Sequence, residues 1–113
     1  MLDFSSLKSA VASLRRSIAV AQSAEKMRFT SDHKETIRAG VIQNFEFTYE
    51  LCWKFMKRWL EVNLGPVYVD GITRKELFRI AAENRLLDDV EDWMDYHATR
   101  NKTIHAYDPS TAE

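Results

Sequence analysis

Helical periodicity is nearly continuous along this chain, and patterns typical of strands are almost absent. From about residue 31 to residue 63, apolar side chains recur at spacings of three and four, which predicts a single helix about 45 Å long. A compact domain of 113 residues does not need so long a helix, so we expect part of it to contact a partner. The sequence therefore predicts an all-α fold.

Three shorter helices are predicted around the long one. The first covers about residues 4 to 25, the next runs from Thr73 to about residue 85, and the last runs from Asp88 or Asp89 to about residue 107. The side chains of Thr73 and of the two aspartates can accept hydrogen bonds from the first free N–H groups of a helix. The first helix carries an apolar stripe made of Leu7, Val11, Leu14 and Ile18.

The long helix has its own predicted ends and its own apolar face. A capping box of Ser31 or Asp32 with Glu35 is expected at its start, and Gly65, in the left-handed conformation, at its end. The predicted stripe consists of Ile37, Val41, Phe45, Thr48, Cys52, Phe55 and Trp59, widened by Phe47, Tyr49, Leu51 and Met56. These aromatic side chains exceed what a small bundle needs, so we infer a helix-lined homodimer interface.

Composition limits the kinds of protein that this chain can be. Apolar residues make up 45% and charged residues 29% of 113 residues, the proportions of one globular domain. No apolar run is long enough for a bilayer and the N-terminus does not resemble a signal peptide, so a cytoplasmic protein is expected. The single cysteine excludes an internal disulfide, and a net charge of −1 means that nucleic acid would have to bind a local basic patch.

The segment from Arg100 to Tyr107 is the part of the chain that most suggests chemistry. Arg100 can hold a phosphate through paired hydrogen bonds, and His105 can move protons near neutral pH, which together favour phosphodiester or nucleotide chemistry. On one ideal helix these two residues lie about 140° apart and would not touch. Either the helix is distorted near Asn101, or the two groups converge with those of a second subunit.

The other polar residues give no sign of a second chemical site. His97 and His105 lie about 12 Å apart along a helix, too far for one zinc ion, and no other motif predicts a metal or a cofactor. His97 and Asn101 fall where the helix pattern asks for apolar residues, so they need polar partners. The acidic cluster of Asp88, Asp89, Glu91 and Asp92 is explained by the positive end of the helix dipole.

The motif residues Arg100, Asn101, His105 and Tyr107 resemble the signature of the HEPN superfamily, small helical proteins encoded beside minimal nucleotidyltransferases. The resemblance continues outside the motif, toward the subgroup called nucleotidyltransferase substrate-binding proteins. It is carried there by Gln43, Phe45, Glu46, Tyr49, Glu50, Leu51, Trp53 and Lys54, then by Phe78, Arg79, Ala81 and Trp93. The resemblance implies one HEPN-like domain over residues 1–113, an up-down antiparallel bundle of four to five helices, a homodimer, and a cognate minimal nucleotidyltransferase as partner.

Some members of this superfamily are metal-independent ribonuclease toxins, which the partner silences by transferring AMP to the motif tyrosine. By resemblance, Arg100 would stabilise the charge on the phosphorane, His105 would act as general acid or base, Asn101 would orient the two, and Tyr107 would accept AMP. The alternative is a non-catalytic subunit in which Arg100, His105 and Tyr107 hold a nucleotide. A third interpretation gives Arg100 and His105 a structural role, paired with acids near Asp95.

The last residues of the sequence carry one further expectation. Ser110-Thr111-Ala112-Glu113 has the pattern of a capping box, a helix start with no helix after it. Members of the superfamily continue into a last helix, so that helix is expected to be missing from this chain, leaving the bundle short of one packing surface.

Overall fold

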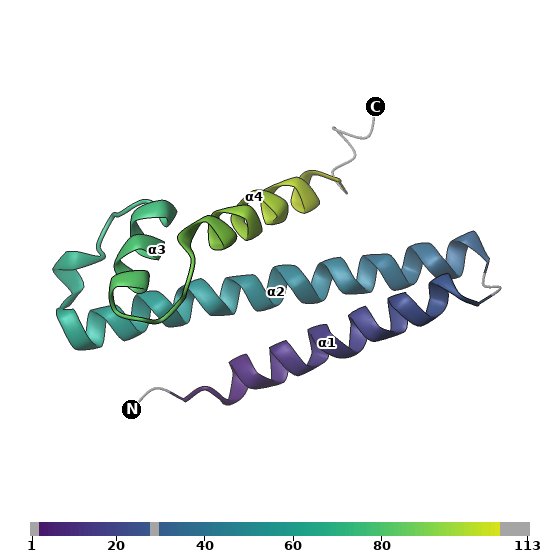
Figure 1. Ribbon diagram of the computed structural model, residues 1–113, viewed down its shortest axis with the longest axis horizontal. Coiled ribbons are helices and arrows are strands. Elements are labelled where there is room, and N and C mark those ends of the chain that lie inside the picture. Colours follow the sequence, from purple (N-terminus) through teal and green to yellow (C-terminus); the bar gives the residue numbers. More distant parts are fainter. Residues whose placement is uncertain (1–2, 28–29, 107–113) are drawn as a thin grey trace. The chain divides into compact units, whose positions relative to one another are not determined.

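The chain folds into helices joined by short turns (Figure 1). The computed structural model describes residues 3–27 and 30–106, with His105 and Ala106 described for the backbone alone. Within these ranges there is no strand, and the elements are α1 Ser5–Glu25, α2 Ser31–Leu64, the 3-10 helix η1 Pro66–Tyr68, α3 Arg74–Glu83 and α4 Val90–Ala106. The predicted all-α class is confirmed.

The chain divides into two compact units, Met1–Leu51 and Cys52–Glu113, and the boundary between them lies inside α2. This division does not test the expected single domain over residues 1–113, which stays a prediction. Of the helices in the described ranges, none has the length and apolar character needed to cross a membrane.

In the first unit, α1 lies antiparallel to the first half of α2 (Figure 1). The contact is made by small and polar side chains. The Ser13 hydroxyl donates to Asn44 Oδ1 at 2.7 Å, and the Thr48 hydroxyl, which donates to the Asn44 carbonyl of its own helix at 2.7 Å, also lies 3.3 Å from the Ala10 carbonyl. Ala10 is only 5% exposed, so the two backbones approach closely there.

The predicted apolar stripe of α1 is therefore not the side that faces α2. Leu7, Val11 and Leu14 are half-buried and Ile18 is 40% exposed, whereas the buried residues of α1 are Ala10 and Ala24. Periodicity identified an amphipathic helix correctly, but the side of α1 that packs on α2 is the one with the smallest side chains.

The long helix shows a similar displacement of its buried face. Met56 and Leu60 are 7% and 0% exposed, and Tyr49 is 3% exposed, whereas Cys52 and Phe55 of the predicted stripe are half-buried. Tyr49 and Met56 lie at the edge of the predicted arc, and Leu60 lies outside it. Thr48 of the predicted stripe is 6% exposed, and the other buried residues lie next to that stripe, about one residue step of 100° around the helix.

Local sequence signals set the ends of the first two helices, although one of them is not the predicted signal. The Asp3 carboxylate accepts hydrogen bonds from the Ser5 hydroxyl at 2.6 Å and from the Ser5 N–H at 2.9 Å. Both bonds, and the one from the hydroxyl most, lower the pKa of Asp3 below its ordinary 3.8. At the start of α2 the predicted capping box is wrong, because the Thr30 hydroxyl accepts the His33 N–H at 3.2 Å and so occupies the cap one residue earlier.

In the second unit, the second half of α2, η1, α3 and α4 surround a small apolar core. Its largest deeply buried side chains are Leu60, Val69, Leu77 and Phe78, none more than 2% exposed. Val69 belongs to a segment that the sequence predicts as a loop. Val69 directly follows the 3-10 turn Pro66–Tyr68 and is only 1% exposed, so this loop contributes a side chain to the core.

The turns that frame α3 agree with the predicted signals, with one exception. Gly65 has φ +107° and ψ 147°, a conformation with positive φ outside the left-handed helical region that was predicted. The Thr73 hydroxyl accepts the Glu76 N–H at 3.2 Å, as predicted, and α3 ends at Glu83, two residues before the expected end. The Asp89 carboxylate accepts the Glu91 N–H at 2.9 Å and caps α4.

Candidate functional site

Helix α4 carries the polar residues that the sequence singles out, and α3 holds α4 in place. The Trp93 ring packs against Phe78 with ring centroids 5.7 Å apart, and against Tyr96 edge-on at 5.2 Å. Phe78 is fully buried, so this aromatic contact anchors the first turns of α4 to the core of the second unit. Because α4 is one continuous helix, the orientation of its first turns also sets the direction of the residues that follow.

Arg100 and Asn101 lie two turns further along α4 and contact each other. The Arg100 guanidinium donates to Asn101 Oδ1 at 3.3 Å, and the Thr103 hydroxyl donates to the Arg100 carbonyl at 2.9 Å. Arg100 is half-buried and Asn101 is exposed. Part of the surface of Arg100 is shielded from water, which strengthens the interaction of a guanidinium with an anion.

The second contact of Asn101 is with His97, one turn earlier on the same helix. Asn101 Nδ2 lies 3.5 Å from His97 Nε2. Because the amide oxygen accepts from Arg100, the amide nitrogen faces the imidazole, and it donates there when Nε2 carries no proton. The structure thus groups Arg100, Asn101 and His97, and the two polar residues at apolar positions of the helix pattern are partners of each other.

His105 and Tyr107 are described less completely. Helix α4 is continuous from Val90 to Ala106, so the alternative of a helix distorted near Asn101 is wrong. Regular geometry over this span places His105 about 140° around the helix from Arg100. The side chain of His105 and the whole of Tyr107 lie outside the described residues, so the roles expected of them remain predictions.

A second cationic group lies in the same unit, on an aromatic ring of α2. The Arg74 guanidinium stacks over the Trp53 ring at 3.5 Å from its centroid, and the Lys54 ammonium lies 5.7 Å from the same centroid. Arg74 Nε is buried without a hydrogen-bond partner, so the π-face of Trp53 is its main compensation. This contact ties the start of α3 to the second half of α2.

Sequence reasoning missed the grouping of His97 with the motif and the pairing of Arg74 with Trp53. A signal for the first exists, because His97 and Asn101 are four residues apart on one helical face. The second joins residues distant in sequence and could not be found from spacing. In the described part of the chain, no three potential metal ligands lie close enough to hold an ion.

The fold and the polar group on α4 define an all-α domain whose candidate site lies on the last described helix. The chain belongs to the family described as nucleotidyltransferase substrate binding protein like, which matches residues 2–113. This confirms the family resemblance seen in the sequence.

Two proteins of Haemophilus influenzae illustrate the relationship. A curated relative, a probable ribonuclease HepT, is 39% identical over 82 residues, which are 70% of this chain and 55% of the relative. The chain thus spans about half the length of that relative. A solved structure, described as the substrate-binding domain of a nucleotidyltransferase, superposes with a TM-score of 0.86 at 31% identity over 97% of this chain and 83% of that one.

Proposed function

We propose that this protein is a metal-independent ribonuclease of the HEPN type, paired with a minimal nucleotidyltransferase that silences it by transferring AMP to Tyr107. The observation that carries the proposal is the half-buried Arg100, held by Asn101 on a helix that continues to His105. The name of the curated relative, a probable ribonuclease, supports the same activity. Family membership supports a nucleotidyltransferase as the partner.

In the proposed reaction, the ribose 2′-hydroxyl attacks the adjacent phosphorus and the bond to the 5′ oxygen breaks. The products are a 2′,3′-cyclic phosphate and a free 5′-hydroxyl. Arg100 stabilises the extra negative charge on the phosphorane, and His105 takes the hydroxyl proton or returns one to the leaving oxygen. Since these two residues lie at different positions around α4, a second copy of the chain supplies the missing group.

Cleavage of a labelled RNA in the presence of a metal chelator tests the activity. We expect wild-type protein to produce cyclic-phosphate ends, and Arg100→Ala or His105→Ala to slow cleavage by about a hundredfold or more. Lys102→Ala is a matched control, because it removes a cation from an exposed position of the same helix. Cleavage by both site variants at the wild-type rate, or none by folded wild-type protein, would contradict the ribonuclease proposal.

Modification of Tyr107 is tested separately by mass spectrometry. Incubation with a minimal nucleotidyltransferase and ATP should add the mass of AMP to the wild-type chain and not to Tyr107→Phe. The modified protein should lose its cleavage activity. An unmodified wild-type chain would contradict AMP transfer while leaving the cleavage result unaffected.

The second candidate function is a non-catalytic subunit that binds the nucleotide or the substrate of the partner. The family description and the description of the solved relative favour it, because both refer to substrate binding. Calorimetry with ATP distinguishes the two candidates: a binding subunit takes up nucleotide, loses it in Arg100→Ala, and cleaves no RNA. Cleavage that depends on Arg100 would contradict this second candidate.

A further inference from the structure

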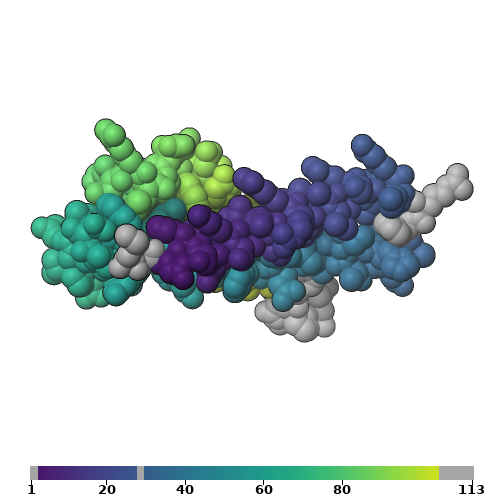
Figure 2. All heavy atoms as spheres, turned by 90° about the horizontal axis from the view of Figure 1, so that it is seen from below, coloured from purple at the N-terminus to yellow at the C-terminus, as the bar shows by residue number. Residues whose placement is uncertain are grey.

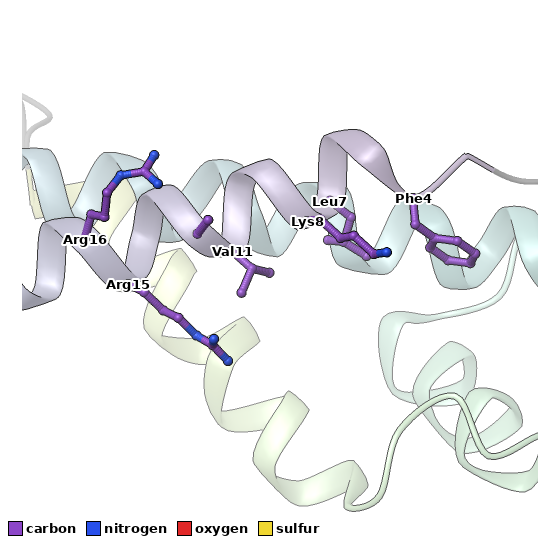
Figure 3. Close-up of a pocket in the computed structure, with 7 residues that line it drawn as sticks. Phe4, Leu7, Lys8, Val11, Arg15 and Arg16 are labelled. Atoms are coloured by element: carbon purple, nitrogen blue, oxygen red, sulfur yellow. The ribbon is translucent and has the colours of Figure 1, made fainter.

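One side of α1 carries apolar side chains that the first unit covers only in part. Phe4 is 45% exposed and Leu7 and Val11 are half-buried, and together they line a shallow hollow of about 620 Å³. Every residue that lines it comes from α1 or the residue just before it (Figure 3). In the space-filling view, α1 forms an outer face of the first unit (Figure 2).

This surface, which we call the basic α1 face, has a one-sided charge. Its charged side chains are Lys8, Arg15 and Arg16, all exposed, and no acidic residue lines the hollow. Arg15 points to the same side of the helix as Val11, and Arg16 points to the opposite side (Figure 3). The one acidic residue of α1 is Glu25, at the far end of the helix.

The charge pattern decides between the possible occupants. A second copy of α1 packed on this face would bring two sets of three cations together with no carboxylate between them, which opposes self-association. A nucleic-acid strand would place its phosphates against Leu7 and Val11, with Phe4 as the one aromatic ring that lines the hollow and could stack on a base. A helix with one apolar stripe and carboxylates beside it satisfies both parts of the surface.

We propose that the basic α1 face binds an amphipathic, acidic helix of another protein. Its apolar stripe packs on Phe4, Leu7 and Val11, and its carboxylates pair with the cations beside that row. From Phe4 to Arg16 the face extends about 18 Å, the length of roughly three helical turns. This inference does not depend on the proposed ribonuclease activity, since it involves no residue of α4.

Two designed peptides of about 14 residues test the proposal by fluorescence anisotropy with the full chain. Both carry the same leucine stripe and differ in having glutamate or lysine beside it. We expect the glutamate peptide to bind about tenfold more tightly, as three exposed ion pairs would provide. The double variant Arg15→Glu, Arg16→Glu should reverse the preference, whereas Lys75→Glu, Lys102→Glu, with the same change in net charge at exposed positions elsewhere, should keep it.

Each other outcome overturns the proposal. Equal binding of the two peptides, no binding of either, or an unchanged preference in the double variant removes charge complementarity as the basis. Preferential binding of a labelled oligouridylate that the double variant loses would assign the face to RNA. Self-association of the wild-type chain in sedimentation that the double variant alone changes would assign the face to a second copy. Circular dichroism of each variant shows that the helices are intact.

Discussion

Arg85 has a backbone conformation that its side chain makes costly, and replacing it should stabilise the protein. Its φ is +61°, in the left-handed region, directly after the last turn of α3. The Arg85 N–H donates to the Ala82 carbonyl at 3.0 Å and the Leu86 N–H donates to the Ala81 carbonyl at 2.9 Å. This pair of bonds closes a Schellman motif, in which glycine usually holds the position of Arg85.

The expected gain follows from two opposing terms. A residue with a Cβ atom in the left-handed region costs about 1–2 kcal/mol, which Arg85→Gly removes. Glycine gives back about 0.5–1 kcal/mol, because its unfolded chain has more freedom to lose. The free energy of unfolding should therefore rise by about 0.5–1 kcal/mol. Arg85→Ala keeps the Cβ atom and should change stability by less than about 0.5 kcal/mol, since Arg85 is exposed.

Urea unfolding followed by circular dichroism measures both variants against the wild-type chain. Arg79→Gly is the matched control, because it introduces the same residue at an exposed position inside α3 and should lower stability by about 1 kcal/mol. If Arg85→Gly is no more stable than Arg85→Ala, the left-handed conformation is not the source of strain and this reasoning fails.

Three further predictions concern the core, a cap and the thiol. Phe78→Ala should lower the free energy of unfolding in urea by about 3–5 kcal/mol, because the ring is fully buried against Trp93. Phe47→Ala, at a residue that is 60% exposed, should lower it by less than about 0.5 kcal/mol. Equal losses in the two variants would contradict this core. Thr73→Ala should cost about 1 kcal/mol and Thr73→Ser much less, and a similar loss in both would exclude the cap. Burial raises the pKa of the Cys52 thiol above its ordinary 9.0, so the stability linked to this shift is fully present below pH 9.0 and is lost as pH rises from there through the raised pKa. An aromatic disulfide reagent at pH 8 should therefore react with the folded chain more slowly than with the urea-unfolded chain, and equal rates would refute the burial.

Local signals in the sequence were enough to predict the helices. Thr73 and Asp89 cap α3 and α4 as expected, because a cap depends on neighbouring residues alone. The cap of α2 was predicted wrongly, since Thr30, Ser31 and Asp32 all suit the position and the structure uses the first.

Periodicity identified the buried face of each helix only in part. In α1 the side facing α2 is marked by Ala10 and Ser13, whose small size matters only once a partner helix is in place. Leu60 was missed on α2 for the same reason, because several apolar stripes around that helix satisfy the same spacing.

The sequence predicted which residues form the candidate site, but only some of the contacts between them. Arg100 and Asn101 do contact each other, and the continuous helix keeps His105 at another position around α4. The contact of Asn101 with His97 is compatible with their spacing of four residues, but the motif pairs Asn101 with His105, which lies at the same spacing in the other direction.

The central claim is that Arg100 of one chain acts with His105 of another, and mixed dimers test it directly. Arg100→Ala and His105→Ala chains, each inactive alone, are unfolded together in equal amounts and refolded, and RNA cleavage is measured. If the site is shared, half of the dimers are mixed and one of their two sites regains both groups, so about a quarter of wild-type activity should return. No recovery from folded, mixed dimers would contradict the claim.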